Sequence, residues 1–196
     1  MIPVVKHFPG HGDTRADSHE ELPVVDKPLE ELEQLELIPF RRAVEEGAPA
    51  VMVAHLLMKE LDPLRPASLS PAVVTDLLRE ELGFEGVIFT DDLTMGAIAD
   101  HYGLGEAAVL AVEAGCDQLL VCHGRENLEE VRAALLEGVE TGRLTEQRLD
   151  ESLRRVLALK RSCALTDDPV NPPDGQALRE KGEAFWGRLE ENKAAS

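Results

Sequence analysis

Residues 86–92, "GVIFTDD", are a short apolar run that ends in two aspartates. A run of four to eight such residues is typical of a buried strand. Strands of this kind belong to parallel sheets covered by helices, and ligands bind at the carboxyl ends of those strands. The stretch therefore predicts a buried parallel strand with Asp91 at its carboxyl end. One of the two aspartates, Asp91 or Asp92, is expected to cap the turn that follows, and a capping role for both fits the sequence as well as catalysis by one.

The same pattern recurs along the chain. Three further apolar runs predict strands at residues 2–5, 49–57 and 117–123. Helix-like segments follow at 29–47 (broken at Pro39), 70–84, 103–116, 126–142 and 145–162. Such alternation predicts an α/β fold with parallel strands and helical crossovers. A closed (β/α)8 TIM barrel needs eight βα units and about 250 residues, so four units predict roughly half a barrel.

The chain divides by composition into three parts. We expect residues 1–164 to form the half barrel with its helices. Residues 165–175, "LTDDPVNPPDG", are rich in Pro and Asp and predict a linker. Residues 176–196 form a tail able to make a short amphipathic helix around Phe185, Trp186 and Leu189.

Charge and composition restrict the function. A formal net charge of −18 argues against nucleic acid or an anionic membrane as the main partner. The longest apolar run falls short of the ~20 residues of a membrane span. The three cysteines lack metal-ligand spacing, and their odd number is typical of reduced thiols. We therefore expect a soluble, cytoplasmic protein.

Residues 6–26, "KHFPGHGDTRADSHEELPVVD", hold three histidines close to several aspartates, and four interpretations are open. As a metal site the stretch is unusual, because its one pair in helical register, His7 and His11, is separated by Pro9 and Gly10. As a phosphate loop it lacks the Gly-Lys-Ser/Thr pattern. A polar surface loop is the third interpretation. The fourth is proton transfer, since Asp17 is able to hold one imidazole nitrogen of His19 and direct the other outward.

Five stretches together carry a family resemblance. They are "KHFPGHGDTRADSH" (6–19), "MVAHLLMKELDPLRPASLSP" (52–71), "ELGFEGVIFTDDLTMGAI" (81–98), "EAGCDQLLVC" (113–122) and "GRLTEQRLDESLRRVLALK" (142–160). In this order they resemble glycoside hydrolase family three, and most of all its bacterial β-N-acetylglucosaminidases of peptidoglycan recycling. The resemblance runs from about residue 3 to residue 161.

The resemblance implies a retaining exo-hydrolase of terminal β-linked N-acetylglucosamine, with neither cofactor nor metal. By position, Asp91 matches the nucleophile, and His19 with Asp17 matches the acid/base dyad. Lys6 and His7 match residues that contact sugar hydroxyls, and the strand-end His55 lies where the family has a histidine near the site.

The family's barrel has a further half before the opening motif. We therefore expect one of three situations: the chain is a fragment, two copies close a barrel as a homodimer, or a separate chain supplies the complementary N-terminal half. Two other functions remain open. One is a non-catalytic binding or assembly module that keeps the family's residues. The other is a metal-dependent TIM-barrel hydrolase that uses the histidine cluster.

Overall fold

The computed structural model describes residues 2–11, 22–163 and 174–194, of which residues 187–194 are described by their backbone alone. The chain separates into two compact units, Met1–Ala164 and Leu165–Ser196. The first unit holds the sheet. The second contains the helix α7 (Gly175–Ala194), on which Phe185 and Trp186 are exposed and stack edge to face. Within the described residues, no helix has the length and apolarity needed to cross a lipid bilayer.

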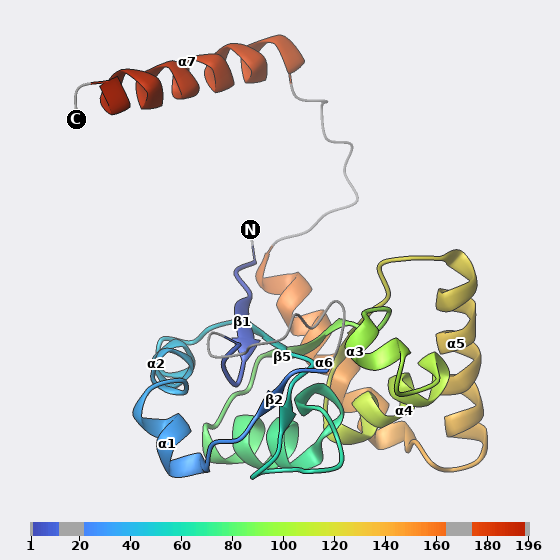
Figure 1. The fold of residues 1–196 in the computed structure, drawn as a ribbon. Coiled ribbons are helices and arrows are strands. Elements are labelled where there is room, and N and C mark those ends of the chain that lie inside the picture. Colours follow the sequence, from blue (N-terminus) through green and yellow to red (C-terminus); the bar gives the residue numbers. More distant parts are fainter. Residues whose placement is uncertain (1, 12–21, 164–173, 195–196) are drawn as a thin grey trace. The chain divides into compact units, whose positions relative to one another are not determined.

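The first unit is built on one parallel sheet (Figure 1). Its strands are β1 (Val5–Phe8), β3 (Ala50–Val53), β5 (Val87–Asp92) and β6 (Gln118–Leu120), and they lie in the order β1-β3-β5-β6. All three neighbouring pairs are parallel. The prediction of an α/β fold with four parallel strands is confirmed.

Helices connect consecutive strands. Between β1 and β3 lie α1 (Leu29–Gln34) and α2 (Ile38–Glu45); between β3 and β5 lie η1 (Ala67–Leu69) and the π-helix η2 (Ala72–Glu81). Between β5 and β6 lie α3 (Gly96–Ala99) and α4 (Leu104–Ala114), and α5 (Arg125–Glu140) and α6 (Glu146–Ser162) follow. The break expected near Pro39 separates α1 from α2, where proline occupies the first turn of α2 because that turn needs no amide donor.

The first strand differs from the prediction. The apolar run at 2–5 predicted it there, whereas β1 covers Val5–Phe8. Pairing with β3 decides the position, since Val5 lies opposite Val51 and Phe8 opposite Val53. Phe8 is fully buried and packs edge to face on Phe40. Burial of Phe8 thus determines where β1 lies in the sequence, and His7, the residue before it, is therefore part of the sheet.

A second, smaller sheet was not predicted. It pairs β2 (Val24–Val25) with β4 (Leu57–Met58) in parallel. Two-residue strands are too short to produce a readable alternation of apolar and polar residues.

The two faces of the main sheet are covered unequally. Val51, Val53 and Ile88 are fully buried, whereas the intervening Met52 and Phe89 are only partly buried. Because side chains alternate between faces along a strand, the first set lies on the helix-covered face and the second on the opposite face. In a closed barrel that opposite face is the packed interior.

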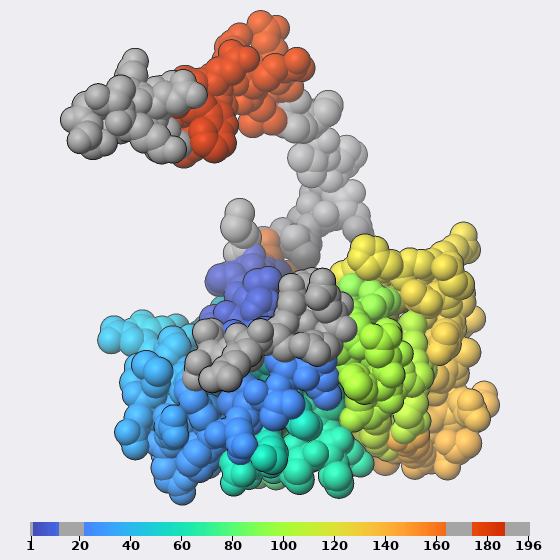
Figure 2. Space-filling model, in the orientation of Figure 1, coloured from blue at the N-terminus to red at the C-terminus, as the bar shows by residue number. Residues whose placement is uncertain are grey.

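Helices α4 and α5 lie side by side (Figures 1 and 2). Their close approach depends on Gly105, because a Cβ at that position would lie 2.8 Å from the Cβ of Ala134. The Glu130 carboxylate of α5 also accepts a hydrogen bond from the Gly105 amide, which is one of the unpaired amides in the first turn of α4.

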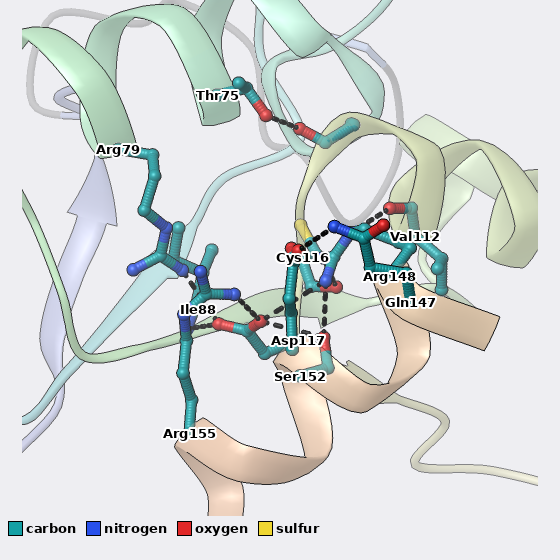
Figure 3. A network of polar contacts seen from close by, with 12 residues as sticks. Thr75, Arg79, Ile88, Val112, Cys116, Asp117, Gln147, Arg148, Ser152 and Arg155 are labelled. Atoms are coloured by element: carbon teal, nitrogen blue, oxygen red, sulfur yellow. Dashed lines mark hydrogen bonds and ion pairs between the residues drawn. The ribbon is translucent and has the colours of Figure 1, made fainter. Parts of the chain in front are cut away.

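A buried carboxylate ties α6 to the sheet (Figure 3). Asp117, just before β6, has a fully buried side chain and accepts hydrogen bonds from Arg79 (2.8 Å) and Arg155 (3.0 Å). It also accepts one from the Ser152 hydroxyl (2.8 Å) and one from the Ile88 amide (3.0 Å). Three elements, η2, β5 and α6, are therefore joined through one side chain.

We expect Asp117→Ala to lower the free energy of unfolding by about 3–5 kcal/mol, because three arginines, Arg79, Arg148 and Arg155, lose their buried counter-ion. Urea denaturation measures the change. Glu106→Gln is the control, since Glu106 pairs with Arg143 on the exposed surface and such pairs contribute less than about 1 kcal/mol. Equal losses for the two variants would contradict the anchoring role of Asp117.

Candidate active site

The carboxyl ends of β1 and β5 bring two predicted site residues together. The Nε2 atom of His7 lies 3.6 Å from the Oδ2 atom of Asp91. These strands are not neighbours, since β3 lies between them, so the two side chains meet across one strand. Their side chains are 29% and 18% exposed, which leaves both within reach of a ligand.

Asp92 caps the turn that follows β5. Its Oδ1 accepts hydrogen bonds from the amides of Thr94 (3.0 Å) and Cys122 (3.1 Å), and its Oδ2 accepts one from the Thr94 hydroxyl (2.7 Å). Burial raises the pKa of Asp92, but these hydrogen bonds together outweigh it and hold the pKa below its ordinary value. Both oxygens of this carboxylate are thus occupied, Oδ1 by two backbone amides and Oδ2 by the Thr94 hydroxyl.

Asp91 has a different environment. Its Oδ1 accepts a hydrogen bond from the Asp92 amide (2.9 Å), and its Oδ2 faces His7. The sequence left open which of the two aspartates caps the turn. In the fold Asp92 does so, and Asp91 keeps one oxygen directed toward the partly exposed His7. A carboxylate held in this way is suited to attack an electrophilic carbon or to accept a proton.

His55 is fully buried just after β3. Its Nδ1 lies 2.7 Å from the Ser68 hydroxyl and its Nε2 lies 3.0 Å from the carbonyl oxygen of Asp92. Burial lowers the pKa of His55 more than the hydrogen bond to Asp92 and the nearby carboxylates raise it. The sugar contact expected for His55 stays a prediction, and both of its ring nitrogens already have protein partners.

The other predicted residues are distributed as follows. Lys6 is exposed in β1, one residue before His7. His11 lies with its ring 6.0 Å from that of His7. Asp17 and His19 lie outside the described residues, so their pairing stays a prediction. In the described part of the chain, no three His, Cys, Asp or Glu side chains are grouped closely enough to hold a metal ion.

Three residues that hold the site were missed by the sequence reasoning: Ser68, Thr94 and Cys122. Thr94 follows Asp92 by two positions, and this spacing is typical of a turn closed by an aspartate side chain. Ser68 and Cys122 carry no local signal, because they reach the site from η1 and from the end of β6.

Parallel strands with helical crossovers, and a histidine and a carboxylate at their carboxyl ends, define an α/β barrel-type protein with an enzyme-like site. The chain belongs to glycosyl hydrolase family 3: the protein-family model described as "Glycosyl hydrolase family 3 N terminal domain" matches residues 1–159. This confirms the family resemblance, and the fold is a partial TIM barrel.

Individual relatives support the same family assignment. A protein named "Beta-hexosaminidase" from Nitrosomonas eutropha is 36% identical over 81% of this chain and 46% of its own length. The solved β-N-acetylglucosaminidase of family 3 from Paenibacillus sp. is 49% identical, with a TM-score of 0.86, over 89% of this chain and 34% of that one. "Zn bound CbsA" from Thermotoga neapolitana is 36% identical, with a TM-score of 0.77, over 81% of this chain and 35% of that one. The chain thus spans less than half the length of each of these relatives.

Proposed function

We propose that this chain carries the nucleophile-bearing half of a retaining exo-β-N-acetylglucosaminidase. The observation that supports this most is the environment of Asp91, whose Oδ1 is held by the backbone while its Oδ2 faces His7 at the carboxyl ends of the strands. The names of the relatives supply the reaction class, β-hexosaminidase. The substrate class is a saccharide with a terminal β-linked N-acetylglucosamine, from peptidoglycan recycling or a chitooligosaccharide.

The proposed reaction has two displacements. In the first, an Asp91 oxygen attacks the anomeric carbon, the glycosidic C–O bond breaks, and His19 donates its proton to the leaving oxygen. In the second, His19 takes a proton from water, the water oxygen attacks the anomeric carbon, and the bond to Asp91 breaks. Asp17 orients His19 throughout, and Lys6 and His7 bind sugar hydroxyls.

Nitrophenyl N-acetylglucosaminide tests the proposal. The assay is run on the chain alone and on the chain mixed with the N-terminal half of a family 3 relative, with and without chelator. Turnover that chelator does not affect supports the glycosidase. Sugar binding without turnover in either preparation supports a non-catalytic module. Activity that disappears in chelator supports a metal-dependent hydrolase.

The proposed function includes a partner chain that completes the barrel. A groove of about 640 Å³ runs along β6, between α5 and α6, and is lined by apolar residues that include Leu119, Val121 and Leu135. Nearby on α6, Leu153 is 54% exposed and Leu157 is 38% exposed. The two leucines are four residues apart and therefore lie on one face of α6, and a large exposed apolar surface marks an interaction site. A second copy of the chain or a complementary half barrel fits this chemistry.

We expect the purified 196-residue chain to be a homodimer that buries more than about 2,000 Å², as obligate interfaces do. Light scattering measures the mass. Leu153→Glu should shift the mass toward the monomer, whereas Leu178→Glu, a change of an equally exposed leucine on α7, should leave it unchanged. A compact wild-type monomer with full activity at micromolar concentration would refute the need for a partner.

A further inference from the structure

His55 is a buried titratable residue that the proposed reaction does not use. The residue after the predicted nucleophile presents its carbonyl oxygen to His55 Nε2 at 3.0 Å. A carbonyl oxygen only accepts hydrogen bonds, so Nε2 carries the proton and donates it. In a neutral ring Nδ1 then accepts from the Ser68 hydroxyl, 2.7 Å away. The contacts thus fix both the tautomer and the direction of the ring.

The carbonyl group that His55 contacts belongs to Asp92, and every polar group of Asp92 makes a hydrogen bond. The Asp92 carbonyl oxygen also accepts a hydrogen bond from the Met95 amide (3.0 Å), and the Asp92 carboxylate is occupied by Thr94 and Cys122. The remaining polar group of Asp92, its amide, donates to Asp91 Oδ1. A shift of the Asp92 backbone as a whole therefore moves the amide donor that orients the Asp91 carboxylate.

Ser68 completes the chain of contacts from the opposite side. It is fully buried on η1, and its carbonyl oxygen lies 3.5 Å from the Cys116 sulfur at the amino end of β6. The path Ser68–His55–Asp92–Asp91 thus runs from the connection after β3 to the carboxyl end of β5. Its first three members have no other role in the proposed reaction.

We propose that His55, held by Ser68, is a positioning residue that fixes the orientation of the Asp91 carboxylate through the Asp92 backbone. This deepens the proposed function and rests on it. In this role His55 acts by aligning the nucleophile through the Asp92 backbone. Because misplacing a reacting group by about 1 Å costs on the order of 10²-fold in rate, a loss of alignment is measurable.

The test compares three variants with a matched control on an activated aryl glycoside, whose departure needs little protonation. His55→Leu removes the donor and should lower kcat on the order of 10²-fold with KM changed less than about threefold. His55→Gln places an amide donor near Nε2 and should recover most of that loss. Ser68→Ala frees the ring and should give an intermediate loss. Thr75→Val is the control, since it removes a part-buried hydrogen bond to Ala114 far from the site.

A purely structural role for His55 would make kcat follow the melting temperature in all four variants, with no recovery in His55→Gln, and would overturn the inference. Suppose that wild type hydrolyses the substrate, that Asp91→Asn abolishes this turnover, and that His55→Leu behaves like Thr75→Val. In that case the inference about His55 fails while the proposed function stands. If Asp91→Asn retains turnover, both the inference about His55 and the proposed function are wrong.

A second measurement does not depend on turnover. Amide hydrogen exchange at Asp92 should be roughly tenfold faster in His55→Leu than in wild type, and unchanged in Thr75→Val, because loss of the contact loosens the turn locally. Unchanged exchange at Asp92 in His55→Leu would overturn the inference even for a chain that is inactive alone.

Discussion

Asp91→Asn abolishes turnover, with an expected loss in kcat on the order of 10⁴-fold or more and a preserved fold. The amide has the shape of the carboxylate, and its oxygen still accepts the hydrogen bond from the Asp92 amide. It lacks the negative charge needed to attack the anomeric carbon and to leave again in the second displacement. The assay uses the assembly that turns over nitrophenyl N-acetylglucosaminide, with circular dichroism as the folding control.

Asp92→Asn is the matched control, because it makes the same chemical change at the next residue. The Asp92 side chain accepts hydrogen bonds in the turn, and an asparagine oxygen keeps the two from the backbone. We therefore expect turnover within about tenfold of wild type, as for a change that costs a hydrogen bond and no reacting group. Asp91→Asn turnover within tenfold of wild type, or equal losses in the two variants, would show that Asp91 is not the nucleophile.

His19→Ala should harm substrates with poor leaving groups far more than activated aryl glycosides. An alkoxide leaving group needs a proton in the transition state, whereas a nitrophenolate leaves without one. General acid catalysis contributes 10²–10⁴-fold, so the losses on the two substrate types should differ by about that factor. The measurement is kcat/KM for a nitrophenyl glycoside and for a disaccharide on the same preparation.

His11→Ala serves as the comparison for His19→Ala, because it removes an imidazole from the same motif. His11 lies near His7, and its loss should affect both substrate types alike. If His19→Ala also gives equal losses on both, another group is the acid. A large selective loss in Asp17→Asn would place Asp17 in the same proton transfer, since an amide orients the imidazole without stabilising its charged form.

Local pattern was sufficient for most of the helices and for three of the four strands of the main sheet. Runs such as "AVMV" and "VIF" are short and apolar throughout, and each lies in a strand of the parallel sheet. Pro39 predicted the break between α1 and α2 because its missing amide and fixed backbone angle act locally. The prediction failed at β1, where the apolar "IPVV" stretch was less decisive than the pairing of Phe8 with β3 and its packing on Phe40.

The sequence by itself determined the family, the parallel α/β fold and the two aspartates at the end of β5. These properties depend on residue type, spacing and the alternation of strands with helices, all of which are local in the chain.

The sequence did not determine which aspartate, Asp91 or Asp92, caps the turn after β5. Asp92 is the cap because its carboxylate accepts hydrogen bonds from the amides of Thr94 and Cys122, and Cys122 comes from another strand end. Similarly, His55 has the sequence context of a strand-end ligand, but its hydrogen bonds run to Ser68 and Asp92 inside the protein. Only the tertiary structure decided these roles, because a polar side chain takes its function from the partners that packing brings within hydrogen-bond distance.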